Sequence, residues 1–153
     1  MGHTNKQSAE ELALANYTQS WRLRAVGFDW PCRYYYEEGG KLILDPNSTE
    51  GNSHINGLDG EYSAPEIELA LQYIREKHGI DCFVQISTWN NSVALWHGVL
   101  PFADESGIGD KKTDIYDKFP QASSAMLDVA LSALEGRSDS DYDEISNLED
   151  RYL

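Results

Sequence analysis

The chain has 153 residues with 26 acids and 12 bases, which gives a formal net charge of −14. This length favours a single domain, and so large an excess of acid excludes direct nucleic-acid binding and docking on an anionic membrane, since both need clustered Lys and Arg. No apolar run approaches the roughly 18 residues of a transmembrane helix, and the N-terminus lacks the basic and apolar regions of a secretory signal. We therefore expect a cytoplasmic protein in which Cys32 and Cys82 are reduced thiols, although the sequence alone also permits one bridge between them.

The first predicted element is a helix over residues 10–25, where good helix formers follow one another. Ser8 followed by Glu11 is typical of a capping box at the start, and Gly27 would end the helix in a left-handed conformation. The side chains with three-to-four spacing, which would form the buried stripe, are Leu14, Tyr17, Trp21 and Ala25.

The stretch DWPCRYYYEEGG, residues 29–40, predicts the first strand of a hairpin. Strand alternation places on one face the side chains that we expect to pack, which are Cys32, Tyr34 and Tyr36. Tyr35 points to the other face, where it would be open to solvent or to a partner. The Gly-Gly pair offers the positive φ angles of a two-residue turn, and residues 41–44 return as the second strand.

A long loop is predicted for residues 45–61, which are rich in Asn, Gly, Asp and Ser. Loops of this length in a compact domain are usually functional or disordered. Ser63 followed by Glu66 predicts a capping box that starts the second helix, and Gly79 ends that helix. Its apolar stripe comprises Ile67, Ala70, Leu71 and Ile74.

Two more strands are predicted from DCFVQIS and SVALWHGVL, with a turn at Asn90 and Asn91 between them. A second long loop then covers residues 103–118, which are rich in charged residues.

Pro120 and Ser123 introduce the last strong helix, which Gly136 closes. Its stripe repeats that of the middle helix and comprises Leu127, Ala130, Leu131 and Leu134. Residues 137–153 are predicted to be an acidic tail outside the domain, with the pattern of a short helix at its end.

Paired strands between helices predict the α+β class. We expect one domain over residues 1–136, in the order helix–hairpin–helix–hairpin–helix, with an antiparallel sheet of about four strands packed by the helices.

Three stretches of the chain resemble a known group of proteins: LRAVGFDWPCRYYYEEGGKL, YSAPEIELALQYIREKHGIDCFVQI and FPQASSAMLDVALSALE. They are similar to small proteins encoded by phages, prophages and mobile elements of gut Bacteroidales, a group with no assigned function. The match covers roughly residues 23–135 apart from the two long loops. The resemblance implies a mobile-element origin and the order of elements given above, and it carries over no catalytic or binding residue.

The sequence offers little chemistry. The cysteines and histidines show no close ligand pair such as C-x-x-C, so we expect no metal and no cofactor. No nucleophile elbow, glycine-rich phosphate loop or HExxH motif occurs. One enzymatic alternative remains, in which His97 acts as a base for Cys32 or Cys82. His97 shares the alternation of Leu95 and Val99, which favours a half-buried strand histidine instead.

The interpretation that we favour is a non-enzymatic protein-binding or inhibitor module whose partner has a basic surface. Binding would involve Tyr35 and the acidic loop residues Asp104, Glu105 and Asp110. A second alternative is an acidic DNA mimic, but the average density of charge is about fivefold lower than on B-DNA, so mimicry needs clustering of the acids. The sequence leaves the oligomeric state open.

Overall fold

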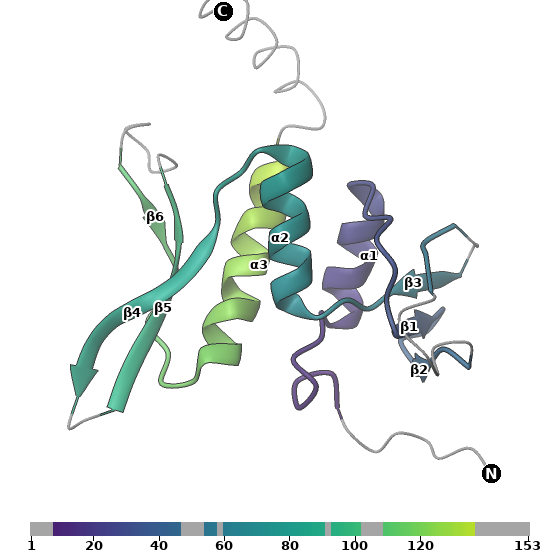
Figure 1. The fold of residues 1–153 in the computed structure, drawn as a ribbon, viewed down its shortest axis with the longest axis horizontal. Helices are drawn as coiled ribbons and strands as arrows, with labels where there is room; N and C mark the ends of the chain where they lie inside the picture. The colour runs from purple at the N-terminus through teal and green to yellow at the C-terminus, as the bar shows by residue number, and fades with distance from the viewer. Residues whose placement is uncertain (1–7, 47–53, 58–59, 91–92, 102–108, 137–153) are drawn as a thin grey trace, which may run out of the picture.

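The computed structural model describes residues 8–46, 54–57, 60–90, 93–101 and 109–136, and their elements confirm the α+β class. Three helices lie side by side between two small antiparallel sheets (Figure 1). The elements, in chain order, are α1 (Tyr17–Ala25), β1 (Tyr34–Glu37), β2 (Leu42–Leu44), β3 (Glu61–Ser63), α2 (Ile67–His78), β4 (Phe83–Asn90), β5 (Val93–Leu100), β6 (Lys111–Lys112) and α3 (Phe119–Glu135).

The helices α2 and α3 form the centre of the core. Their predicted stripes are confirmed, since all eight apolar side chains are buried, and Met126 of α3 is fully buried between them and the second sheet. Gly79 follows α2 with a φ of 66°, in the left-handed region that favours glycine at a helix end. The 3.6-residue periodicity was a sound guide here because each helix buries one continuous apolar face.

The prediction for α1 is wrong at its start and in its stripe. Ser8 does accept a hydrogen bond from the Glu11 amide, but residues 9–13 form turns, and the helix begins only at Tyr17. Asn16 and Gln19 form the capping box instead, each side chain bonded to the backbone N–H of the other. The buried side chains of α1 are Gln19, Ser20 and Leu23, whereas Trp21 and Ala25 of the expected stripe are exposed.

The first sheet has the strand order β2-β1-β3. Tyr36 is buried on β1, and its hydroxyl donates to the Ala15 carbonyl, so the packing predicted for this side chain is confirmed. Gly39 and Gly40 both have positive φ, but the connection from Glu37 to Lys41 holds three residues rather than two. The sequence predicted the end of a loop and a helix cap where the structure has β3. Ser63 is a strand residue whose side chain bonds to His54, and α2 starts only at Ile67.

The second sheet has the order β4-β5-β6 and lies on α3. The structure therefore has two sheets of three strands, not the single sheet of about four strands that we expected. β6 was missed because two lysines inside a charged segment give no strand signal. The register of β4 against β5 shifts between Ile86 and Thr88, where one extra residue forms a bulge.

Several predictions fall on residues that the structure does not describe, namely the short helix in residues 137–153 and parts of the two long loops, residues 47–53, 58–59 and 103–108. In the described part of the chain, no helix combines the length and the apolar character needed to cross a membrane.

Candidate functional site

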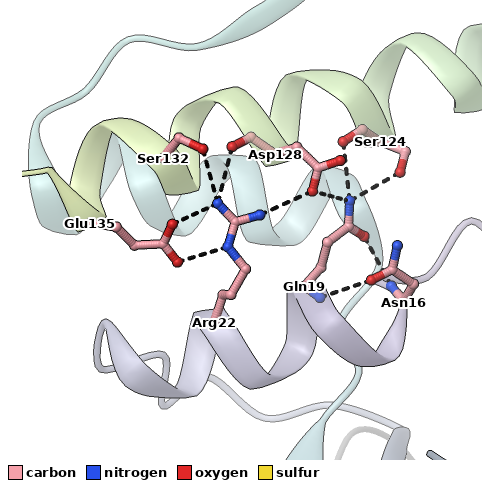
Figure 2. Close-up of polar contacts among 7 residues, drawn as sticks. All are labelled: Asn16, Gln19, Arg22, Ser124, Asp128, Ser132 and Glu135. Carbon is pink, nitrogen blue, oxygen red and sulfur yellow. Dashed lines mark hydrogen bonds and ion pairs between the residues drawn. The ribbon is translucent and has the colours of Figure 1, made fainter.

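A polar interface joins α1 to α3, and Figure 2 shows its members. Gln19 is almost fully buried, and its amide nitrogen donates to the carbonyl and hydroxyl of Ser124 and to Asp128 Oδ1 at 3.0–3.1 Å. Its amide oxygen accepts the N–H of Asn16 at the N-cap. The same side chain thus caps α1 and attaches it to α3, which explains why a polar residue occupies a buried position.

Arg22 continues this interface one turn further along α1. Its guanidinium makes a two-pronged contact with Glu135, with both N–O distances at 2.7 Å, and also donates to Asp128 and Ser132. The hydrogen bond to Glu135 raises the pKa of Arg22, and burial opposes this. These groups bond to one another, so the interface attaches α1 to α3.

A second polar cluster lies beside the first sheet. His54 Nδ1 is 2.6 Å from Ser63 Oγ, and His54 Nε2 is 3.0 Å from Glu61 Oε1. Because the carboxylate only accepts, Nε2 carries the proton and Nδ1 accepts the Ser63 hydroxyl in the neutral imidazole. The ring of Tyr35 stacks on His54 with centroids 4.4 Å apart. Burial raises the pKa of Tyr35, and the carboxylate of Glu61 adds to this.

The hydroxyl of Ser63, the imidazole of His54 and the carboxylate of Glu61 have the composition of a hydrolytic triad. The hydroxyl, however, is not open to a substrate. Ser63 is fully buried on β3, so a substrate carbonyl cannot reach its hydroxyl. The cluster instead fixes the segment before β3, where Asn56 also accepts the Ser63 amide and donates to the Phe28 carbonyl. Tyr35 is therefore one wall of this cluster, and its role towards a partner stays a prediction.

The two thiols are free and buried. Burial raises the pKa of Cys32 to about 12 and that of Cys82 to about 11, so neither forms a thiolate near neutral pH. Their hydrogen-bond acceptors are backbone carbonyls, those of Trp30 and Leu71 respectively. Both thiols therefore have the environment of structural cysteines.

His97 lies on β5 and is buried. Its Nε2 is 2.9 Å from the side-chain nitrogen of Gln85, the residue opposite it on β4. Burial lowers its pKa, and Lys112 lowers it further, which favours the neutral ring. Its polar partner is an amide and not a thiol, so the geometry gives no support to a base paired with Cys32 or Cys82.

Two residues that lie opposite each other on β4 and β5 point their side chains to the same face of the second sheet. The register of the two strands therefore shows which face each side chain is on. Gly98, opposite Val84, faces α3, since a Cβ at Gly98 would lie 2.7 Å from Met126 Cβ. Two residues away on the same face, the ring of Trp96 contacts Phe119, the first residue of α3, with centroids 5.1 Å apart.

This face continues past the helix as an exposed apolar surface. Ile86 lies opposite Trp96, and Trp89 lies opposite Ala94, so both side chains are on the same side of the sheet as Phe119. Trp89 is 62% exposed, and Ile86 and Phe119 are exposed as well. Figure 1 shows the paired strands extending away from α3. We call Ile86, Trp89, Trp96 and Phe119 the ribbon patch.

The bulge brings these side chains together. Ile86 and Trp89 are three positions apart, and strict alternation would place them on opposite faces. Ser87 is the extra residue between Ile86 and Thr88, and it shifts the alternation by one position. Trp89 consequently points to the side that α3 covers elsewhere in the sheet.

Tyr116 lies between the ribbon patch and a cavity of about 460 Å³. Its backbone pairs with that of Trp96 in two hydrogen bonds of 2.7 Å, and the residue also lines the cavity. The exposed acids Asp114 and Asp117 flank Tyr116 in the chain. The cavity lies between the turns before α1 and the first turns of α3, and its polar lining includes Glu10, Asn16, Gln121, Ser124 and Asp128.

The acidic residues predicted for binding belong to the segment that joins β5 to β6. Asp110 is exposed immediately before β6, whereas Asp104 and Glu105 lie outside the described residues. The part of the chain that the structure describes contains no cluster of three or more His, Cys, Asp or Glu side chains able to hold a metal ion.

Comparison of the chain with protein-family models, with curated proteins and with solved structures finds no match. The candidate site therefore depends on the geometry alone. The ribbon patch was not predicted from the sequence, because aromatic residues in strands more often belong to core and cross-strand packing.

Proposed function

We propose that this protein is a non-enzymatic binding module that acts in the cytoplasm, and that the ribbon patch docks on a protein partner with an apolar centre and a basic rim. The resemblance to mobile-element proteins favours a role in which the partner belongs to the host or to a competing element.

The exposure of Trp89 next to Ile86 is the observation that carries the proposal. Folded proteins expose single apolar side chains routinely, but contiguous aromatic and aliphatic surface beside a helix end is typical of an interface. Tryptophan is also among the residues that contribute most to binding free energy when a partner covers them.

Charge indicates the kind of partner. The chain carries a net charge of −14, and the exposed Asp114 and Asp117 lie next to Tyr116 at the border of the patch. A basic rim on the partner would pair with these acids and speed the encounter at low salt. Asp104, Glu105 and Asp110 would add to this attraction, because their segment leaves the same sheet.

Two tryptophans make a matched test. Trp89 on β4 and Trp21 on α1 are 62% and 55% exposed, but Trp21 lies outside the ribbon patch. Proteins captured from a host lysate by the wild-type chain would be identified by mass spectrometry, and the affinity of the purified partner would then be measured for each variant. We expect Trp89→Ala to weaken binding by about tenfold or more and Trp21→Ala to leave it unchanged.

A second arm tests the acids. Replacing Asp104, Glu105 and Asp110 by their amides should slow association and reduce its dependence on salt, with little change in stability. Equal losses of affinity in Trp21→Ala and Trp89→Ala would refute the assignment of the patch. Competition between the partner and DNA would favour mimicry, and a turnover abolished by His97→Ala in a substrate screen would favour the enzymatic alternative.

A further inference from the structure

The two sheets have four edges, and three of them are short or covered. β2 and β3 have three residues each, and β6 has only two, both lysines. On β3 the Ser63 amide donates to Asn56, and the Glu61 carbonyl accepts from Arg24, so side chains take up backbone groups of this edge. Short length, lysines and covering contacts are the devices by which proteins keep sheet edges from pairing with other chains.

The fourth edge, β4, lacks these devices except for the bulge at Ser87. It spans eight residues, FVQISTWN, with no charged residue and no proline. β4 pairs with β5 on one side, and in the described part of the chain no backbone hydrogen bond joins its other side to another segment. The bulge leaves a regular stretch from Phe83 to Ile86 before it, with Val84 packed on the core and Phe83 exposed.

We propose that β4 pairs with β4 of a second copy of this chain, so that the two second sheets join into one antiparallel sheet of six strands. A row of unpaired N–H and C=O groups recognises another extended strand. A twofold axis between two antiparallel β4 strands makes the interface self-complementary. This proposal goes beyond the proposed function, because it uses the edge of the sheet and leaves the ribbon patch on its face.

The absence of charge on β4 favours a second copy as the occupant, because an uncharged strand offers no ion pair to a charged one. Each chain carries −14, so two copies that met through acidic surfaces would repel each other. β4 carries no acid, and pairing with itself therefore places no like charges opposite one another. The remaining repulsion acts over a distance and is screened by salt. Self-association should therefore strengthen as salt rises, whereas binding to a basic partner should weaken.

Two phenylalanines of equal exposure make it possible to test the β4 edge and the ribbon patch separately. Phe83 on β4 and Phe119 on α3 are each 38% exposed, and replacing either by glutamate adds the same charge. Sedimentation equilibrium of the full chain, over a range of concentration and salt, would give the association constant. We expect Phe83→Glu to weaken self-association by about tenfold or more, since each substitution enters a twofold interface twice. Phe119→Glu should leave it unchanged.

Hydrogen exchange provides a readout that does not depend on a variant. At high protein concentration the amides of β4 should exchange more slowly than at low concentration, while those of β1 should not change. A single-chain mass at all concentrations and salts, an equal loss in both glutamate variants, or association that weakens with salt would overturn the proposal. None of these results would bear on the comparison of Trp89→Ala with Trp21→Ala, so failure of this proposal is distinguishable from failure of the proposed function.

Discussion

The two sheets lie on either side of the same helices but direct their side chains differently. In β2-β1-β3, the hydroxyl of Tyr36 bonds to Ala15, and Tyr35 stacks on a histidine that is itself bonded to Ser63. In β4-β5-β6, Ile86 and Trp89 extend past α3 and are exposed. The first sheet thus satisfies its polar and aromatic groups within the domain, and the second leaves apolar groups that a partner could cover. The comparison shows why abundant aromatics in a sequence do not identify a binding surface, since Tyr35 and Tyr36 of the YYY strand both have partners inside the domain.

The attachment of each sheet to the helices differs as well. The second sheet lies on α3 through close apolar packing at Gly98, whereas the first region, through α1, is joined to α3 by charged and amide side chains. Apolar packing and exposed ion pairs differ in strength, so we expect substitutions in the two attachments to have unequal effects.

The largest effect is expected at Gly98. A Cβ there would lie 2.7 Å from Met126 Cβ and 2.8 Å from its sulfur, so Gly98→Ala forces the sheet away from α3. We expect a loss of about 2 kcal/mol in the free energy of unfolding, measured by denaturant titration. Gly57→Ala is the matched control, because a Cβ at that position would meet no atom within 4 Å. Equal stability of the two variants would contradict the close approach of sheet and helix.

A smaller loss is expected when the polar attachment of α1 is removed. Arg22→Met deletes the contacts to Glu135 and Asp128 while keeping much of the apolar stem. Those carboxylates are 41% and 53% exposed, so water compensates in part and we expect a loss of about 1 kcal/mol. The exposed Arg33 supplies the control Arg33→Met. A loss at Arg22 that exceeded the loss at Gly98 would reverse the ranking of the two attachments.

The last expected effect appears only at alkaline pH and concerns the two thiols, one at a time. Burial raises the pKa of Cys32 from its ordinary value of 9.0 to about 12, and that of Cys82 to about 11. The unfolded chain therefore releases these protons above pH 9 while the folded chain keeps them. The stabilisation is complete below pH 9 and is lost as the pH rises towards the folded values. Between pH 8 and pH 10 we expect each thiol to account for a decline of about 1 kcal/mol.

Single substitutions of each cysteine show how much of this loss of stability comes from Cys32 and how much from Cys82. Cys32→Ala and Cys82→Ala should each show a smaller loss of stability between pH 8 and pH 10 than the wild-type chain, in denaturant titrations at both pH values. Tyrosines and lysines titrate in the same range, but they are common to all three chains and cancel in the comparison. An unchanged loss in either variant would show that the corresponding thiol is not shielded from water in the folded protein.

The sequence predicted the parts of the fold that bury a regular apolar face. The stripes of α2 and α3 have helical spacing and nothing competes with them, so both helices were found with their buried residues. α1 was misjudged because two of its three buried residues, Gln19 and Ser20, are polar. Gln19 is interior only because Ser124 and Asp128 of α3 lie opposite. No local pattern reports a partner that is more than 100 positions away in the chain.

The candidate site was harder to foresee than the fold. The residues 54, 61 and 63 lay in or beside a predicted loop, so their convergence beside Tyr35 had no signal in the sequence. Trp89 was visible as an aromatic residue of a strand, but its exposure depends on where α3 begins and on the register of β4. Both are tertiary facts, and the patch therefore required the structure.

Because of the bulge on β4, the ribbon patch depends on the number of residues in the strand as well as on their types. Loss of Ser87 would restore simple alternation, and Trp89 would turn to the opposite side of the sheet from Phe119. The hydrophobic content of the strand would hardly change, and its predicted secondary structure would stay the same. A one-residue deletion, an event that surface segments often tolerate, would thus divide the surface between two faces. Relatives of this chain could gain or lose the surface in a single step of that kind, without any substitution among the residues that form it.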